Sequence, residues 1–99
     1  MRISVLAIAA AIVAPVLALE HAVWIISDGF VPQSITIKAG DTVKWTNNDK
    51  YYTHTVTPIF PKPISPGMSL SFQFNTPSIV DYYCSIHPFM EGKVIVEKV

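Results

Sequence analysis

Apolar and polar residues alternate along much of the chain after residue 20, which is the pattern of β-strands with one buried face. The clearest examples are residues 34–38 and 42–46, whose apolar side chains share one face. Further segments of strand character are 22–27, 54–57, 68–74, 79–84 and 93–97. No stretch after residue 20 has helical periodicity. The pattern predicts an all-β fold, an antiparallel Greek-key β-sandwich of seven or eight short strands.

Glycine and proline mark the connections between these strands. Gly40 suits a tight turn, because glycine adopts positive φ without strain. Residues 58–67 contain four prolines and predict a stiff loop rather than a strand. We expect Trp24 and Trp45 to anchor the core, and Met68 to pack into it with the alternating residues of its strand.

The first 18 residues have the layout of a secretory signal peptide. Arg2 gives a positive start, residues 3–14 are almost wholly apolar, and Ala18 supplies the small residue before a cleavage site. We expect cleavage after Ala18, leaving one domain, residues 19–99, in the periplasm or the extracellular space. The alternative is an uncleaved membrane anchor, because residues 3–19 are at the short edge of the length that crosses a bilayer. A membrane is an expected partner only in that case.

Charge and cysteine content exclude several classes of function. Without Arg2 the chain carries six lysines and seven acidic residues, with no basic run, so nucleic acid is not an expected partner. Cys84 is the only cysteine, which rules out a disulfide within the chain. An odd cysteine in an exported protein is a free thiol, a link to another chain or a metal ligand.

Candidate metal ligands cluster near the end of the chain. Cys84, His87 and Met90 follow one another at intervals of three residues, and His54 begins a predicted strand upstream. Two histidines, one cysteine and a weakly bound methionine form the ligand set of a blue-copper site, which accepts both Cu(I) and Cu(II). We therefore expect one copper ion, with Cys84 and both histidines as strong ligands and Met90 as the weak axial ligand.

This motif and its surroundings resemble the cupredoxins, the plastocyanin/azurin family. The C-x-x-H-x-x-M spacing and the HPFM ending, both within residues 84–90, are most similar to those of its amicyanin-like members. The similarity extends over nearly the whole predicted domain, through residues 30–32, 35–48, 54–56 and 81–84. It implies a cupredoxin-type β-sandwich and an exported electron-transfer protein with a single type 1 copper.

The resemblance also implies roles for residues near the ligands. In this family an asparagine near the first histidine often ties the two ligand loops together, and Asn47 is the first candidate, followed by Asn48. The backbone N–H of Thr55 is expected to donate to the sulfur of Cys84, a contact that tunes the reduction potential.

Apolar residues surround the ligand that we expect to reach the surface. Pro88 and Phe89 directly follow His87 in the sequence, and Tyr51 and Tyr52 lie near His54. An apolar rim around one exposed imidazole serves brief docking with a protein electron donor or acceptor. Phe89 has a second interpretation, which is compatible with the first: it seals the copper from water.

These features predict a one-electron carrier between exported redox proteins, and not an enzyme, because four protein ligands leave no open position for a substrate. The alternative is a periplasmic protein that binds and delivers copper. A copper oxidase or nitrite reductase needs further histidines, and only His21 remains. His21 lies near the predicted new N-terminus, where an amine and an imidazole can bind copper, although a frayed end is the simpler expectation.

Overall fold

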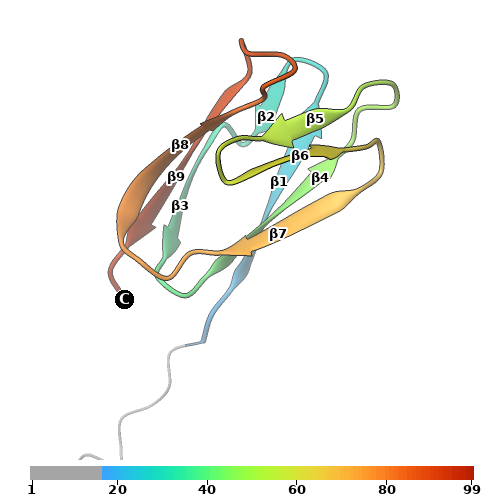
Figure 1. Ribbon diagram of the computed structural model, residues 1–99. Helices are drawn as coiled ribbons and strands as arrows, with labels where there is room; N and C mark the ends of the chain where they lie inside the picture. Colours follow the sequence, from blue (N-terminus) through green and yellow to red (C-terminus); the bar gives the residue numbers. More distant parts are fainter. Residues whose placement is uncertain (1–16) are drawn as a thin grey trace, which may run out of the picture.

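Nine strands within residues 17–99 form two main sheets, which face each other across a core, and a third sheet of two strands (Figure 1). These residues are the part of the chain that the computed structural model describes. One sheet has the strand order β2-β1-β4-β7 and the other has the order β3-β9-β8. The strands are β1 (Glu20–Ile26), β2 (Gly29–Val31), β3 (Ser34–Lys38), β4 (Thr42–Asn47), β5 (His54–Val56), β6 (Phe60–Ile64), β7 (Ser69–Gln73), β8 (Ser78–Tyr83) and β9 (Glu91–Glu97).

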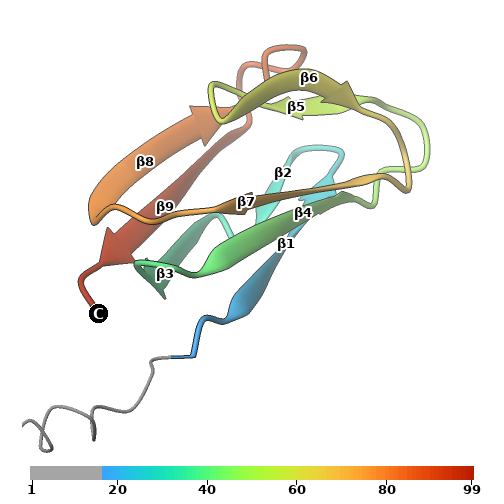
Figure 2. The same cartoon turned by 60° about the horizontal axis from the view of Figure 1, so that its bottom comes forward.

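The short hairpin of β5 and β6 extends the second layer. An antiparallel bridge between Thr57 and Tyr83 joins this hairpin to the end of β8. Figure 2 shows β5 and β6 continuing the layer of β8 over β4 and β7. The arrangement brings the start of β5 beside the end of β8, so residues 54 and 84 become neighbours although they are 30 positions apart.

Alternation of side chains within each strand builds the core between the sheets. Strand β4 turns Val43 and Trp45 inward, and β9 does the same with two of its valines. Trp45 meets the rings of Phe74 and Tyr82 edge-on, with centroids 6.3 and 5.4 Å away. The prediction that Trp45 anchors the core is therefore confirmed.

The expected all-β sandwich is confirmed, with two differences. The described residues contain nine strands instead of seven or eight, and the pairs β1–β4 and β3–β9 are parallel rather than antiparallel. Parallel neighbours require a crossover connection. Here the chain passes from β1 through β2 to β3 in the other sheet before it returns to β4.

The proline-rich segment 58–67 contains strand β6, so the prediction of a stiff loop was wrong. Pro61 and Pro63 lie within this strand. Strand β6 pairs with β5 and forms the edge of a two-stranded sheet. Edge strands tolerate proline, because the N–H that proline lacks is not needed on the side that faces solvent.

Two apolar side chains expected in the core are exposed. Trp24 is 46% exposed, because β1 turns its neighbours Val23 and Ile25 inward. The sequence did not show which residues of this strand face inward, since almost every residue in 22–27 is apolar. Met68 is 54% exposed and directly precedes β7, the edge strand of its sheet.

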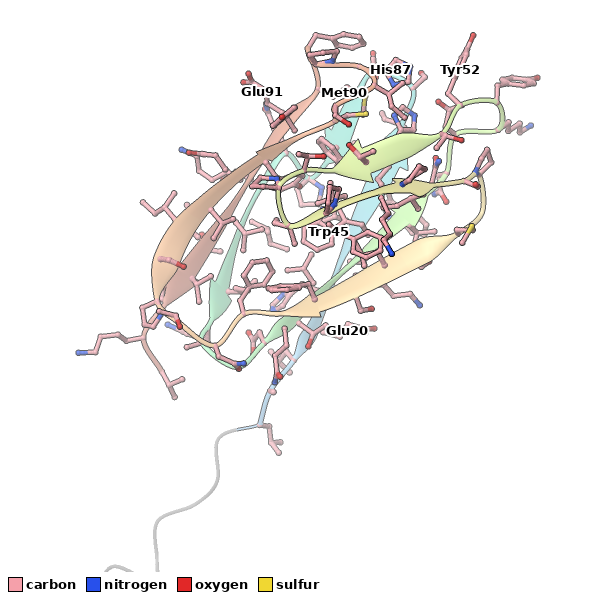
Figure 3. All side chains as sticks on the ribbon, viewed as in Figure 1. Glu20, Trp45, Tyr52, His87, Met90 and Glu91 are labelled. Atoms are coloured by element: carbon pink, nitrogen blue, oxygen red, sulfur yellow. The ribbon has the colours of Figure 1, made fainter. Side chains whose placement is uncertain are left out.

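The predicted ligands and the start of the sandwich lie at opposite ends of the molecule. Figure 3 shows His87 and Met90 at one end and Glu20 at the other, with Trp45 between them. The predicted signal peptide, residues 1–18, falls almost wholly outside the described residues. Within residues 17–99, the structure has no helix long and apolar enough to cross a membrane.

Candidate metal centre

Three of the side chains expected as ligands converge on one point. The Nδ1 atoms of His54 and His87 lie 3.2 Å apart, and each is 3.7 Å from Sγ of Cys84. No other set of three or more histidine, cysteine or acidic side chains within residues 17–99 has its ligand atoms this close together. The structure thus joins the distant histidine to the Cys84 loop, and metal binding by the three stays a prediction.

A closed loop brings the fourth expected ligand, Met90, to the same place. The backbone N–H of Met90 donates to the carbonyl of His87 at 2.9 Å, and the N–H of Cys84 donates to the carbonyl of Met90 at 3.1 Å. Met90 therefore lies next to Cys84 and His87 (Figure 3), and its side chain is 1% exposed.

The spacing of the three donor atoms fits a metal ion at their centre. Bonds of about 2.0 Å to nitrogen and about 2.3 Å to sulfur are usual in metal sites with these donors. At trigonal angles, such bonds separate the nitrogens by about 3.5 Å and place each nitrogen about 3.7 Å from the sulfur. The observed separations are 3.2 and 3.7 Å. Two imidazoles, a buried thiol and an adjacent thioether fit one copper ion of type 1.

Asp49, which the sequence analysis missed, fixes the orientation of His54. Its Oδ2 lies 2.9 Å from Nε2 of His54, and both side chains are buried. When Nε2–H donates to the carboxylate, Nδ1 has no proton and is free to bind a metal. The only signal in the sequence was an acidic residue in an Asn-Asn-Asp loop, which turn preference explains equally well.

The hydrogen bonds that Asp49 accepts keep it charged. The backbone N–H of Tyr51 donates to Oδ1 at 3.0 Å, and that of Tyr52 lies 3.3 Å away. The Tyr51 N–H and then the His54 ring hold the pKa of Asp49 below its ordinary value, although its burial acts in the opposite direction. A carboxylate with a lowered pKa is ionised at neutral pH, so a fixed negative charge lies behind His54.

Thr55 connects the two ligand loops. Its backbone N–H lies 3.4 Å from Sγ of Cys84, in the expected position. Its hydroxyl oxygen also accepts the backbone N–H of Ser85 at 2.8 Å and lies 3.0 Å from the Ser85 hydroxyl. These side-chain contacts hold the start of β5 and the Cys84 loop in a fixed relation. The effect of Thr55 on a reduction potential stays a prediction.

Asn47 stabilises the first of these loops instead of bridging the two. Its Nδ2 donates to the carbonyl oxygens of Tyr52 and Ile64, at 2.9 and 2.8 Å. Its Oδ1 accepts the backbone N–H of Asp49 at 2.9 Å. Asn47 therefore links the segment that carries Asp49 and His54 to β6, whereas the tie between the ligand loops comes from Thr55.

Known proteins with similar sequences and structures share this architecture. The chain is 39% identical over 77 residues to amicyanin-alpha of Methylorubrum extorquens. It is 32% identical over 84 residues to a plastocyanin of Scenedesmus fuscus, covering 69% of this chain and 86% of that protein. The crystal structure of amicyanin from Paracoccus versutus matches with a TM-score of 0.70 and 36% identity, covering 89% of this chain and 88% of that one. This chain belongs to the cupredoxin family.

The similarity of this cupredoxin to full-length amicyanins is partial. The matched segment spans 69% of this chain, but only 64% of the Methylorubrum protein and 58% of the Paracoccus versutus amicyanin. No protein-family model matches the chain. A purple cupredoxin from Nitrosopumilus maritimus shares the fold, with a TM-score of 0.71 at 24% identity, covering 78% of this chain and 99% of that one.

An apolar rim surrounds His87 of this cupredoxin, which is the only partly exposed member of the three-donor cluster. Phe89 is 68% exposed, and Ile86 and Pro88 are exposed as well. The rings of Tyr52 and Phe89 have their centroids 5.8 and 6.3 Å from that of His87. That Phe89 also seals the site from water stays a prediction. Docking of a partner on Pro88 and Phe89 stays a prediction.

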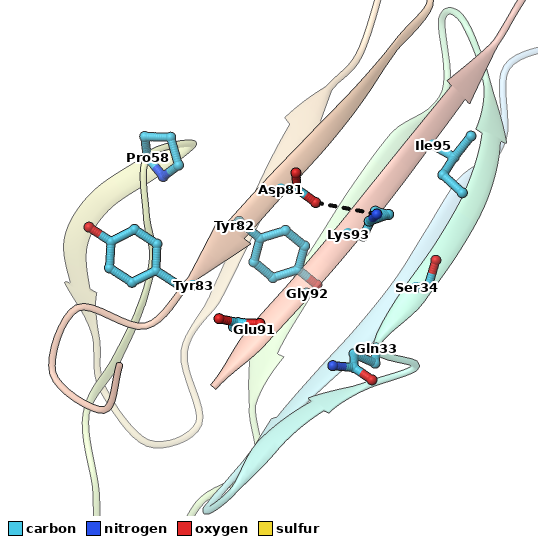
Figure 4. Close-up of a pocket in the computed structure, with 10 residues that line it drawn as sticks. All are labelled: Gln33, Ser34, Pro58, Asp81, Tyr82, Tyr83, Glu91, Gly92, Lys93 and Ile95. Carbon is cyan, nitrogen blue, oxygen red and sulfur yellow. Dashed lines mark ion pairs between the residues drawn. The ribbon is translucent and has the colours of Figure 1, made fainter. Parts of the chain in front are cut away.

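A groove of about 1000 Å³ lies along β8 and β9 (Figure 4). Asp81 and Lys93 form an exposed ion pair across it, with 3.6 Å between Oδ1 and Nζ. Its lining residues include no histidine or cysteine, so it offers no donor set of the blue-copper type. Among residues 17–99, the cluster of three donors lies instead at the end of the sandwich that carries His87.

Proposed function

We propose that this cupredoxin is a one-electron carrier whose single type 1 copper is held by His54, Cys84, His87 and Met90. The observation that supports the proposal is the convergence of two Nδ1 atoms and one thiol sulfur within 3.7 Å of one another. When bound, the copper supplies a reversible Cu(I)/Cu(II) couple. Because hydrogen bonds cross-link the two ligand loops, the donors need little rearrangement when the charge of the site changes by one.

Each donor has its own part in this proposal. Cys84 binds as a thiolate, and its proton leaves when the metal binds. Asp49 keeps the proton of His54 on Nε2, so Nδ1 stays free to bind. Met90 is the weak fourth donor. His87 reaches the apolar rim, so its ring is the route by which electrons enter and leave.

The proposed partners are exported redox proteins that dock briefly on Pro88 and Phe89. A small apolar contact suits a complex that must dissociate after each transfer. The balanced charge of the chain adds no strong electrostatic steering toward one class of partner. The signal-peptide pattern of residues 1–18 supports a periplasmic or extracellular location, with residues 19–99 as the mature domain.

A copper-delivery protein is the competing proposal, since it would use the same donor types. The burial of His54, Cys84 and Met90 favours retention of the ion. The links from Thr55 and Asp49 favour retention too, because a delivery site has to open readily. No enzymatic role is proposed, because four protein donors leave no position for a substrate.

The proposal is tested by the absorption spectrum of residues 19–99 after addition of Cu(II). We expect a strong visible thiolate-to-copper band that saturates at one copper per chain, bleaches on reduction and returns on oxidation. The Cys84→Ala variant should fold, as judged by circular dichroism, and lack the band. A colourless, weakly bound Cu(II) species would defeat the carrier proposal. Rapid loss of copper to a chelator, without reversible reduction, would favour delivery.

A further inference from the structure

A buried carboxylate lies at the end of the sandwich opposite the metal centre. Asp41, in the turn between β3 and β4, is 3% exposed. Its Oδ1 accepts the backbone N–H of Leu19 at 2.9 Å. Its Oδ2 accepts the backbone N–H of Lys38 at 3.0 Å and lies 2.9 Å from Nε2 of His21. His21, expected to fray, is thus held in place.

Within residues 17–99, the ion-pair partner of Asp41 is His21, which is positive only when protonated. The ammonium of Lys38 is engaged elsewhere, with its Nζ 3.0 Å from Oε1 of Glu97. Burying a carboxylate without a full positive charge beside it is unfavourable. Three hydrogen bonds, of which the Leu19 N–H contributes most, hold the pKa of Asp41 down at about 2. The site therefore keeps its negative charge while lacking a permanent cation.

We propose that removal of residues 1–18 supplies this cation, because the new α-ammonium of Leu19 docks on Asp41. The nitrogen that becomes the terminus is the atom that already donates to Oδ1. Hydrolysis of the Ala18–Leu19 peptide bond adds one water, leaving a carboxylate on Ala18 and an amine on Leu19 that takes up a proton. The neutral amide donor is thereby replaced by a charged one, so the attraction between opposite charges is added to the hydrogen bond.

The surroundings of Leu19 suit a chain terminus. Leu17 and Ala18 are exposed, and β1 begins at Glu20. The carbonyl of Leu19 accepts the backbone N–H of Thr42 at 2.9 Å, which fixes the residue against the start of β4. Within residues 17–99, the hydrogen-bonded structure thus begins at the residue that cleavage after Ala18 would expose. This inference rests on the predicted signal peptide and is independent of the copper site.

Docking of the ammonium has a defined pH dependence. A free α-amino group has a pKa of about 7.7–8.0, and an adjacent carboxylate raises it in the folded protein. The added stability is complete below the unfolded-state value and is lost as the pH rises through the folded-state value. Apart from the terminus, His21 on β1 faces Asp41, and the Lys38–Glu97 pair joins β3 to the end of β9 beside it.

The first test compares two copper-loaded proteins of natural sequence, one beginning at Leu19 and one at Leu17. At pH 6, urea unfolding should give a folding equilibrium constant about fivefold larger for the form beginning at Leu19. The difference should disappear by pH 10, and Asp41→Asn should abolish it at every pH. Equal stability of the two forms at pH 6 overturns the proposal.

A second test does not depend on the folding of Asp41→Asn. The α-amine of the form beginning at Leu19 should react with an amine-acylating reagent at pH 7 about fivefold more slowly than the free peptide Leu-Glu-His, because a raised pKa that gives a fivefold gain in the folding constant lowers the neutral fraction of the amine by about the same factor. Reaction at the peptide's rate overturns docking. Mass spectrometry of the exported protein should give Leu19 as its first residue, and any other start contradicts the proposal.

Discussion

Asp49 places a negative charge directly behind His54, on the side of the ring that faces away from Cys84. Its Oδ2 lies 2.9 Å from Nε2, whereas Nδ1 of the same ring is 3.7 Å from the Cys84 sulfur. A negative charge near the metal favours Cu(II) over Cu(I), and the hydrogen bond makes His54 a stronger donor. Both effects lower the reduction potential.

The variant Asp49→Asn tests whether Asp49 acts on the copper site through its charge and its bond to His54, and not only by supporting the loop. The amide can still accept hydrogen bonds through its oxygen, but the charge is gone. We expect copper affinity to fall about 10- to 100-fold and the reduction potential to rise. Voltammetry and competition with a copper chelator measure the two effects. Glu20→Gln, at an exposed residue at the opposite end of the sandwich from His87, is the matched control and should change neither. An unaltered potential in Asp49→Asn would refute the role.

Met90 is buried beside Cys84 and is the weak donor of the proposed site. In Met90→Gln, an amide oxygen replaces a soft thioether. A harder ligand stabilises Cu(II) relative to Cu(I), so we expect copper to be retained and the potential to fall. Voltammetry and the visible spectrum check this expectation. Complete loss of the metal would show that the axial role is wrong.

The four proposed ligands could be identified from the sequence, but the residues that support them could not. The regular spacing of Cys84, His87 and Met90 within one loop predicts these three ligands. His54 is predicted from its residue type. The hydrogen bond between Asp49 and His54 depends on the shape of a loop between two strands. The hydroxyl contact of Thr55 reaches a residue 30 positions away. No pattern of adjacent residues encodes such contacts.

At the scale of strands, one glycine on β9, Gly92, makes room for a large side chain of β8. Gly92 pairs in register with Tyr82, whose ring lies over it. A Cβ added at Gly92 would overlap that ring, and Tyr82 cannot move aside easily because it is buried against Phe30 and Trp45. The absence of a side chain at this position therefore lets the Tyr82 ring fill the core.

Gly92→Ala should destabilise the protein by about 1–3 kcal/mol, since one extra carbon in a close-packed site forces its neighbours to shift. Urea unfolding measures the loss. Gly29→Ala is the matched control, because a Cβ at Gly29 would meet no atom within 4 Å and its φ is not positive. Equal stability of the two variants would mean that the Tyr82 ring relocates at no cost.

The number and pairing of strands were only partly readable from the sequence. Period-two segments such as residues 34–38 and 42–46 were identified correctly, because one of their faces is buried and the other is not. Strand β6 was hidden by its prolines. The orientation of Trp24 was hidden by uniformly apolar neighbours. The parallel pairs arise from the order in which the chain visits the two sheets, which local patterns do not contain.

At the scale of the whole molecule, Asp41 and Tyr82 set opposite limits of pH stability. The pKa of Asp41 is about 2, below its ordinary value of 3.8. The contribution of Asp41 to the stability of the folded state is therefore complete above pH 3.8 and is lost as the pH falls toward 2. Tyr82 lies between the sheets, and removal of its hydroxyl from water raises its pKa to about 12. The stability of the fold accordingly falls as the pH rises above the ordinary tyrosine value of 10.0.

Tyr82→Phe tests the alkaline limit. In the natural sequence, the unfolded chain releases the Tyr82 proton near pH 10 and the folded protein retains it to about 12, so about 2–3 kcal/mol of stability is lost across that interval. The hydroxyl is buried without a hydrogen-bond partner among the described residues, so its removal should leave stability at pH 7 nearly unchanged.

Urea unfolding of the metal-free protein at pH 7, 10 and 11.5 should show a smaller loss of stability at alkaline pH in Tyr82→Phe. The control Tyr83→Phe, on the exposed face of the same strand, should behave as the natural sequence does. Identical pH profiles for all three proteins would mean that Tyr82 ionises without opening the core.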